Sequence, residues 1–245
     1  YLALYSEPAI SGGGGGGGEM ASSDGWDEWD EWLVTDWHFV GNAGSSTLEP
    51  NLVFAAVSGG VNTAPARSTG STGIRTASGA AVNTGGFIHS GHGSMYMLSN
   101  TVWQWRVVGS VLQTNGNLAR LGFSDSTSTV EPVDALMFAV TNQVAWPVAL
   151  SNSVKSVASS GFTLQQGVVY GFDIRQTNDL AAFQIYSNII GAPSVLVYSD
   201  SISGGLPLGS SRSLGLLIGG YNGDTSNTNS TDILNFERMR LRQRN

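Results

Sequence analysis

The stretch TVWQWRVVGSV, residues 101–111, carries two different faces of side chains. Trp103 and Trp105 alternate along it with the polar residues Gln104 and Arg106. Successive side chains of a β-strand point to opposite faces, so this alternation predicts a strand with one face buried and the other in contact with solvent.

Short runs of the same kind recur along the chain. They span residues 51–57, 118–125, 134–141, 168–176, 181–188, 194–200, 213–221 and 232–244, with an edge strand expected at 73–76. Asn-Gly at 115–116, Gly-Gly at 204–205 and Asn-Gly-Asp at 222–224 mark turns between the runs. Many short strands without a long helix predict an all-β fold of two antiparallel sheets packed as a sandwich.

The composition agrees with this fold class and excludes several functions. Of the 245 residues 41% are hydrophobic, which is enough for a sizeable core, but only 12% are charged, whereas exposed helices usually carry many Glu and Lys. The net charge of −7 argues against nonspecific nucleic-acid binding, which needs a basic surface. The chain has no cysteine, and no apolar run approaches the roughly 20 residues of a membrane span.

The N-terminal part differs from the rest of the chain. Seven glycines, Gly12–Gly18, predict a flexible linker, because glycine carries no side chain to bury. We therefore expect an N-terminal arm over residues 1–20, an anchoring segment rich in Trp and acids over 21–37, and a sandwich over 38–245.

The anchoring segment repeats tryptophan at helical spacing. Trp26, Trp29 and Trp32 recur every three residues, and Leu33 and Trp37 extend the stripe. This spacing predicts a short helix whose aromatic face packs at an assembly interface. The alternative is a row of tryptophans that stack on sugar rings.

Arginines alternate along the last predicted strand. Arg238, Arg240 and Arg242 fall on one face of it, followed by Arg244. Because aligned like charges repel, we expect an acidic partner for this face, and we expect Arg238 or Arg240 to pair with a carboxylate. The acidic tryptophan segment, in the same chain or in another subunit, is the candidate partner.

Several segments, taken in order, resemble a known family. They are WQWRVVGSV, LARLGFSDS, EPVDALMFAVTN, VAWPVALSN, VVYGFDIRQTNDLAAFQIYSN and DILNFERMRLR. Together they resemble the concanavalin A-like jelly-roll modules of tailed-bacteriophage structural proteins, over roughly residues 32–244. One departure is Asn235-Phe236-Glu237, where the family usually has an aspartate-tyrosine pair.

The resemblance implies a jelly-roll sandwich and a non-enzymatic role in a virion. The chain would be a tail fibre, spike or capsid-decoration protein of the extracellular particle. It would bind other virion proteins, form a homotrimer, and attach in some cases to host surface polysaccharide. It implies neither membrane insertion nor nucleic-acid binding.

The same fold also occurs in glycoside hydrolases, which place Glu-x-Asp-x-Glu on one strand. This sequence has no such triplet; the nearest is Glu28-Trp29-Asp30, and Asp125, Glu131 and Asp134 cluster around a turn. Hydrolysis needs two carboxyl groups that flank the glycosidic bond. We therefore expect no catalytic residues, with a hydrolase as the least favoured alternative.

Metal ligands are sparse. His89 and His92 lie three residues apart in a glycine-rich loop, where loop polarity explains them. Lectins of this fold often hold Ca²⁺ in loops such as Asn222–Asp232, but only Asp224 and Asp232 are charged there, and calcium prefers several carboxylates. We expect no cofactor, with Ca²⁺ at these two aspartates as the alternative.

A second functional hypothesis is a glycan-binding, lectin-like module for receptor recognition. Exposed aromatic residues at one end of the sandwich would stack on the sugar while Asn and Asp bind its hydroxyl groups. The candidates are Trp146, Tyr221 and Tyr96.

Overall fold

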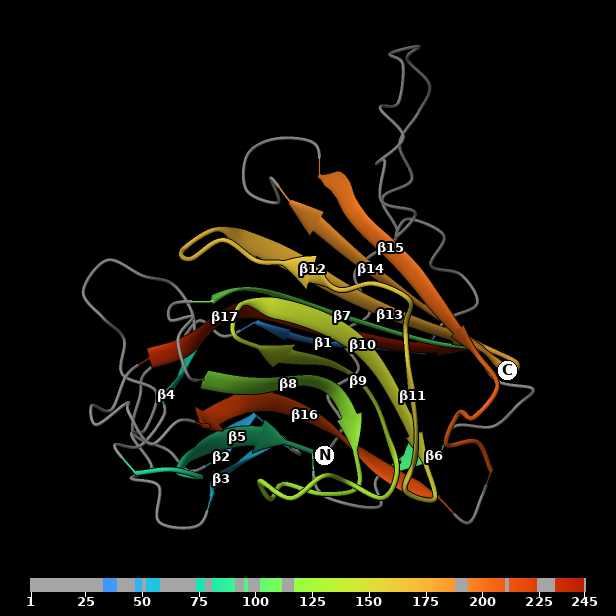
Figure 1. Ribbon diagram of the computed structural model, residues 1–245, viewed down its shortest axis with the longest axis horizontal. Coiled ribbons are helices and arrows are strands. Elements are labelled where there is room, and N and C mark those ends of the chain that lie inside the picture. Colours follow the sequence, from blue (N-terminus) through green and yellow to red (C-terminus); the bar gives the residue numbers. More distant parts are fainter. Residues whose placement is uncertain are drawn as a thin grey trace, which may run out of the picture.

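The computed structural model describes residues 33–38, 47–49, 52–57, 74–77, 81–90, 95–96, 102–111, 117–187, 194–209, 212–223 and 232–244. These residues form two antiparallel sheets, which confirms the predicted all-β sandwich (Figure 1). No helix in the described ranges is long and apolar enough to cross a membrane.

The first sheet, sheet A, has seven strands in the order β1-β17-β7-β13-β14-β15, with β4 also paired to β17. Its strands are β1 (Leu33–His38), β4 (Ile74–Ala77), β7 (Val102–Val111), β13 (Val169–Thr177), β14 (Leu180–Ser187), β15 (Val195–Ser203) and β17 (Asp232–Arg244). β1 and β17 pair residue by residue, although they come from opposite ends of the chain.

The second sheet, sheet B, has ten strands in the order β11-β10-β9-β8-β16-β5-β3-β2. β12 also pairs with β10, and β6 with β16. Its strands are β2 (Thr47–Glu49), β3 (Leu52–Val57), β5 (Gly85–His89), β6 (Met95–Tyr96), β8 (Asn117–Ser124), β9 (Ala135–Thr141), β10 (Val144–Ser151), β11 (Val154–Val157), β12 (Phe162–Thr163) and β16 (Ser213–Asn222).

Tight turns join consecutive strands of sheet B. Asn142 and Gln143 link β9 to β10, and both have positive φ angles, 47° and 73°. Asn152 and Ser153, at 56° and 64°, link β10 to β11 in the same way. Positive φ at both central residues is typical of type I′ turns, whose twist matches that of the flanking strands.

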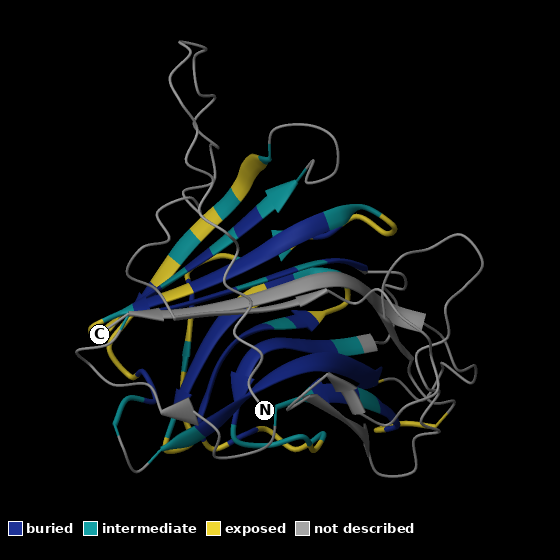
Figure 2. Ribbon diagram, turned by 180° about the vertical axis from the view of Figure 1, so that it is seen from behind, coloured by how far each residue is buried: buried dark blue, intermediate teal, exposed yellow. Residues whose placement is uncertain are grey.

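The main core lies between the two sheets and is rich in aromatic residues. Phe138 of sheet B packs against two phenylalanines of sheet A, with ring centroids 5.5 Å from Phe172 and 5.2 Å from Phe183. Trp105 packs against Phe123 across the same space, with centroids 6.2 Å apart. All five side chains are fully buried, so the apolar face predicted for residues 101–111 is confirmed. Figure 2 shows buried residues, in dark blue, along strands of both sheets.

The outer face of sheet B is also buried in large part. Phe87, Leu217 and Tyr221 form one apolar cluster there, and Ala135, Met137, Val148 and Leu150 form another. The segment after β8 folds back over this face, because Arg120 donates hydrogen bonds to the carbonyl oxygens of Ser128 (2.7 Å) and Thr129 (3.1 Å). Sheet A therefore offers the more open polar face.

The prediction of a helix that extends to Trp37 is wrong. Leu33 and Trp37, expected on a helix, belong to strand β1, where Trp37 lies opposite Met239 of β17. The reason is tertiary: β17 offers an edge to which residues 33–38 can hydrogen-bond, and this pairing overrides the helical spacing. Trp26, Trp29 and Trp32 lie outside the described residues.

Candidate functional site

Polar side chains meet on the outer face of sheet A. In the register, Asp173 of β13 lies between Arg106 of β7 and Gln184 of β14. Residues directly opposite each other in neighbouring strands share a face of the sheet. These three residues therefore belong to one row, on the face opposite to Trp105, Ile174 and Phe183 of the core.

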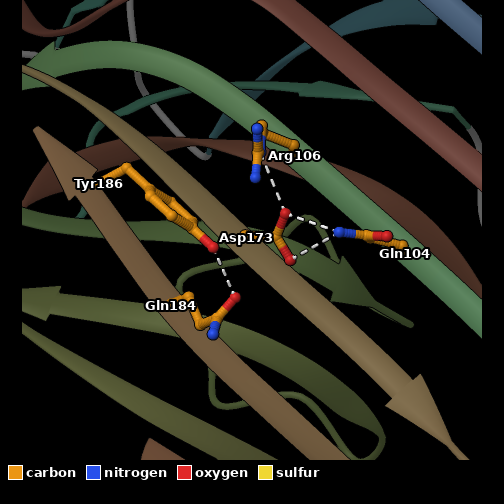
Figure 3. Close-up of polar contacts among 5 residues, drawn as sticks. All are labelled: Gln104, Arg106, Asp173, Gln184 and Tyr186. Atoms are coloured by element: carbon orange, nitrogen blue, oxygen red, sulfur yellow. Dashed lines mark hydrogen bonds and ion pairs between the residues drawn. The ribbon is translucent and has the colours of Figure 1, made fainter. Parts of the chain in front are cut away.

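Asp173 is at the centre of this group and is only 1% exposed. The Gln104 amide nitrogen donates to both of its carboxylate oxygens, at 3.2 and 2.9 Å. Arg106 Nε donates to Asp173 Oδ2 at 3.0 Å, which forms an ion pair (Figure 3). A buried carboxylate is tolerated only with such charged and hydrogen-bonded partners.

Tyr186 completes the group from β14. The guanidinium carbon of Arg106 lies 4.8 Å from the centre of the Tyr186 ring, which is a cation–π contact. The Tyr186 hydroxyl donates to Gln184 Oε1 at 2.8 Å. The cluster of Gln104, Arg106, Asp173, Gln184 and Tyr186, here called the Asp173 cluster, thus holds an aromatic ring and a side-chain amide in fixed positions (Figure 3).

Exposed polar residues surround the Asp173 cluster on the same face. Arg175 lies opposite Gln104 in the register, and its side chain is exposed. Ser199 and Ser201 of β15 are exposed and lie opposite Gln184 and Ala182. Gln184 and Tyr186 themselves are half-buried. The face therefore presents a ring, an amide, hydroxyl groups and guanidinium groups to solvent.

The three aromatic residues predicted to bind glycan do not form one site. Trp146 of β10 is 36% exposed, on the outer face of sheet B. Tyr221 is only 6% exposed, because its ring packs against Phe87 and lies under Arg120, so the expectation that it is exposed is wrong.

Tyr96 of β6 lies beside β16, but far along that strand from Tyr221. Tyr96 pairs with Ser213, eight residues before Tyr221 in β16, which corresponds to about 27 Å along a strand. The two tyrosines therefore do not lie at one end of the sandwich and cannot hold the same sugar ring.

The predicted calcium ligands cannot be located. Asp224 and the side chain of Asp232 lie outside the described residues, as does His92. The part of the chain with described side chains contains no group of three or more His, Cys, Asp or Glu that could hold a metal ion.

The carboxylates that the sequence places around residue 130 have structural partners. Asp125 Oδ2 accepts from the Asp134 backbone N–H at 3.2 Å, and Asp134 pairs with Arg212. Glu131 pairs with Lys155. These contacts fasten the segment between β8 and β9.

Asp200 and Tyr198 of β15 close one edge of the sandwich. Ser159 Oγ donates to Asp200 Oδ2 at 2.9 Å, and the Tyr198 hydroxyl donates to the Ser160 carbonyl at 2.7 Å. Desolvation acts to raise the pKa of Asp200, but hydrogen bonds from Ser201, Ser159 and Ser160 hold that pKa below its ordinary value. Burial raises the pKa of Tyr198, with a further contribution from the Asp200 charge. Both residues thus join the two sheets.

The arginine strand lies beside the Asp173 cluster. The β17 register sets Arg238 opposite Val108, Arg240 opposite Arg106 and Arg242 opposite Gln104. On its other side, Arg240 lies opposite Asp36 of β1. A carboxylate residue therefore occupies the adjacent strand, as the predicted ion pair requires. The side chains of β1 and β17 lie outside the description, so the pair itself remains a prediction.

The residues of the Asp173 cluster are not among the site residues predicted from the sequence. A signal was present, because each of β7, β13 and β14 has polar residues two apart: Gln104 and Arg106, Asp173 and Arg175, Gln184 and Tyr186. That spacing puts each pair on one face. Only the register of three strands shows that the pairs are neighbours.

The chain resembles known proteins in its fold but not in its sequence. No protein-family model matches the chain, and no curated protein matches it in sequence. Among solved structures, it is similar to a protein of unknown function from Shewanella oneidensis MR-1, with 11% identity, a TM-score of 0.66 and 87% of each chain covered.

Two further similar structures have described roles. Peanut lectin shows 9% identity and a TM-score of 0.57, over 87% of this chain and 97% of the lectin. The CBM2 module of the evolved Dit protein of Lactobacillus casei BL23 phage J-1 shows 12% identity and a TM-score of 0.50, over 86% of this chain and 96% of that module. At these identities the likeness concerns the fold, and the chain has the concanavalin A-like jelly-roll fold of lectins.

Proposed function

We propose that the chain is a non-catalytic carbohydrate-binding jelly-roll module of a bacteriophage particle, and that its outer face of sheet A binds the glycan. The observation that carries this proposal is the Asp173 cluster, in which Tyr186, Gln184 and Arg106 are held in place on a half-exposed sheet face. Such a particle would use the module for assembly with other virion proteins and for attachment to host surface polysaccharide.

The chemistry of the face suits a sugar. Carbohydrate ligands combine apolar ring faces with many hydroxyl groups, so their sites need an aromatic surface and paired hydrogen-bond donors and acceptors. Tyr186 supplies the ring, the Gln184 amide supplies donors and an acceptor, and Ser199 and Ser201 supply hydroxyl groups. The ion pair with Asp173 positions Arg106 against the Tyr186 ring, and the Tyr186 hydroxyl in turn positions Gln184, before any ligand arrives.

We propose that the chain is not catalytic because of the partners and the spacing of the carboxylates on this face. Both oxygens of Asp173 already accept hydrogen bonds from Gln104, and Arg106 binds one of them. Within the described strands of sheet A, the other carboxylate in the same register row is Asp36. Three strand spacings separate the two backbones, about 14 Å. Retaining glycosidases bring their two carboxyl groups to about 5–5.5 Å.

The phage context rests on similarity alone. The resemblance over residues 32–244 and the fold shared with a phage Dit carbohydrate-binding module both support it. A purely architectural role is the second candidate, favoured by Val195, Leu196 and Val197. These three are 48%, 48% and 38% exposed on β15, which is an edge strand of sheet A among the described strands. An edge strand can hydrogen-bond to a strand of another protein, and its exposed apolar side chains can pack against that protein.

The test is binding of the fluorescently labelled full chain to a panel of bacterial strains, before and after removal of their surface polysaccharides. We expect saturable binding that disappears with the polysaccharide. Tyr186→Ala should weaken it by about fivefold or more, because truncating an aromatic anchor typically costs over about 1 kcal/mol. Trp146→Ala is the matched control on sheet B and should bind like the wild type.

Three results would overturn parts of this proposal. Absence of binding to every strain would favour the architectural role. Loss of binding in Trp146→Ala but not in folded Tyr186→Ala would move the site to sheet B. New reducing ends released from a bound polysaccharide would show that the chain is an enzyme. Thermal unfolding of each variant establishes that it is folded, and Gln184→Ala provides a second probe of the face.

A further inference from the structure

Arginine is concentrated on one face of one sheet. By register, Arg240 lies opposite Arg106, and Arg242 lies opposite Gln104, which lies opposite Arg175 in turn. Residues that alternate along β17 stay on the same face. By register, six of the ten arginine positions of the chain therefore belong to the outer face of sheet A: Arg106, Arg175, Arg238, Arg240, Arg242 and Arg244.

The register rows of this face contain more basic than acidic positions, in contrast to the whole chain. The chain has a net charge of −7. In the register rows that contain these arginines, the described strands place two carboxylates, Asp36 and Asp173, on the same face. Arginine positions thus outnumber carboxylate positions in these rows, and we expect a positive potential over this face of an acidic protein.

The arrangement favours a ligand with repeated carboxylate groups. Arg238, Arg240 and Arg242 follow one another at about 7 Å along the strand. Guanidinium groups bind carboxylates through paired, charge-assisted hydrogen bonds. Gln184, Tyr186 and the exposed serines of β15 add partners for hydroxyl groups. Nucleic acid fits less well, because the overall negative charge repels a continuous chain of phosphates.

We infer that the outer face of sheet A selects an acidic polysaccharide, one whose sugars carry carboxylate groups. This inference rests on the proposed function and names the class of its ligand. Arg175 is the most accessible described arginine of the face, since its side chain is exposed while Arg106 is held by Asp173 and Tyr186. Arg175 is accordingly the described residue expected to meet the ligand carboxylate directly.

The experiment measures binding of the full chain to three immobilised probes: polygalacturonate, the same polymer after chemical reduction of its carboxyl groups, and double-stranded DNA. We expect binding to polygalacturonate that weakens as salt rises, with at least tenfold weaker binding to the reduced polymer and to DNA. Arg175→Gln should weaken polygalacturonate binding by about tenfold, because hydrogen bonds to charged groups are the stronger ones. Arg175→Glu should abolish most of it.

The matched control is Lys155→Gln, which also removes one positive charge, but on β11 of sheet B, where Lys155 pairs with Glu131. It should bind polygalacturonate like the wild type. Equal loss in Lys155→Gln and Arg175→Gln, or equal binding to DNA, would overturn the inference in favour of general charge attraction. A different outcome is that the chain binds the acidic and the reduced polymer equally well, and loses both interactions in Tyr186→Ala. That result would overturn the inference but keep the proposed function. Binding to no polysaccharide would overturn both.

Discussion

Replacing Phe138 with alanine is expected to lower the free energy of unfolding by about 3–5 kcal/mol. Phe138 is 0% exposed and makes edge-on contacts with Phe172 and Phe183 of the opposite sheet. Its truncation would remove the buried apolar surface of the ring and leave a cavity between the two sheets. The rigid strands on both sides cannot close this cavity. Urea unfolding followed by tryptophan fluorescence measures the change.

Val130→Ala is the control for this prediction. Val130 is 71% exposed, so its truncation should change the free energy of unfolding by no more than about 0.5 kcal/mol. A loss below about 1.5 kcal/mol in Phe138→Ala would mean that the sheets do not pack through this residue.

Replacing Asp173 with alanine is expected to lower the free energy of unfolding by about 3 kcal/mol or more. Asp173 is 1% exposed, and its removal would break the ion pair with Arg106 and both hydrogen bonds from the Gln104 amide. The cost would come chiefly from taking a counter-charge away from the partly buried Arg106, because breaking one side of a buried pair costs more than the net attraction of the pair. Urea unfolding again provides the measurement.

Asp173→Asn separates charge from hydrogen bonding at this position. The amide oxygen can still accept from Gln104, so the expected loss is smaller than for alanine but remains measurable. If the Asp173→Ala variant were as stable as the wild type, Asp173 would not organise the face. The fixed positions of Tyr186 and Gln184 would then need another cause.

Most strands could be predicted from the sequence because alternation and burial agree in them. The run at 101–111 became β7, and the runs at 118–125, 134–141 and 168–176 became β8, β9 and β13 within one residue or so of their bounds. Gly204 and Gly205 form a turn with positive φ as expected. β10 was harder to recognise as a separate strand, because Pro147 in its middle lacks the N–H that strands use.

Strand β1 and the site could not be predicted in the same way. Trp37 has helical spacing from its neighbours, but strand pairing with β17, two hundred residues later in the chain, decides its conformation. The glycan prediction requires exposed aromatic residues, but the sequence does not distinguish Tyr221, buried under Arg120, from Tyr186 on the open face. Both failures concern register and burial between strands distant in sequence, which local patterns do not encode.

The most direct measurement is hydroxyl-radical labelling of the full chain with and without a polysaccharide that it binds, read out residue by residue with mass spectrometry. Tyr186 on sheet A and Trp146 on sheet B are both aromatic, partly accessible and reactive, so each is an internal reference for the other. We predict that ligand lowers the labelling rate of Tyr186 several-fold and leaves that of Trp146 unchanged. Protection of Trp146 with Tyr186 unchanged would contradict the assignment of the binding site to the outer face of sheet A.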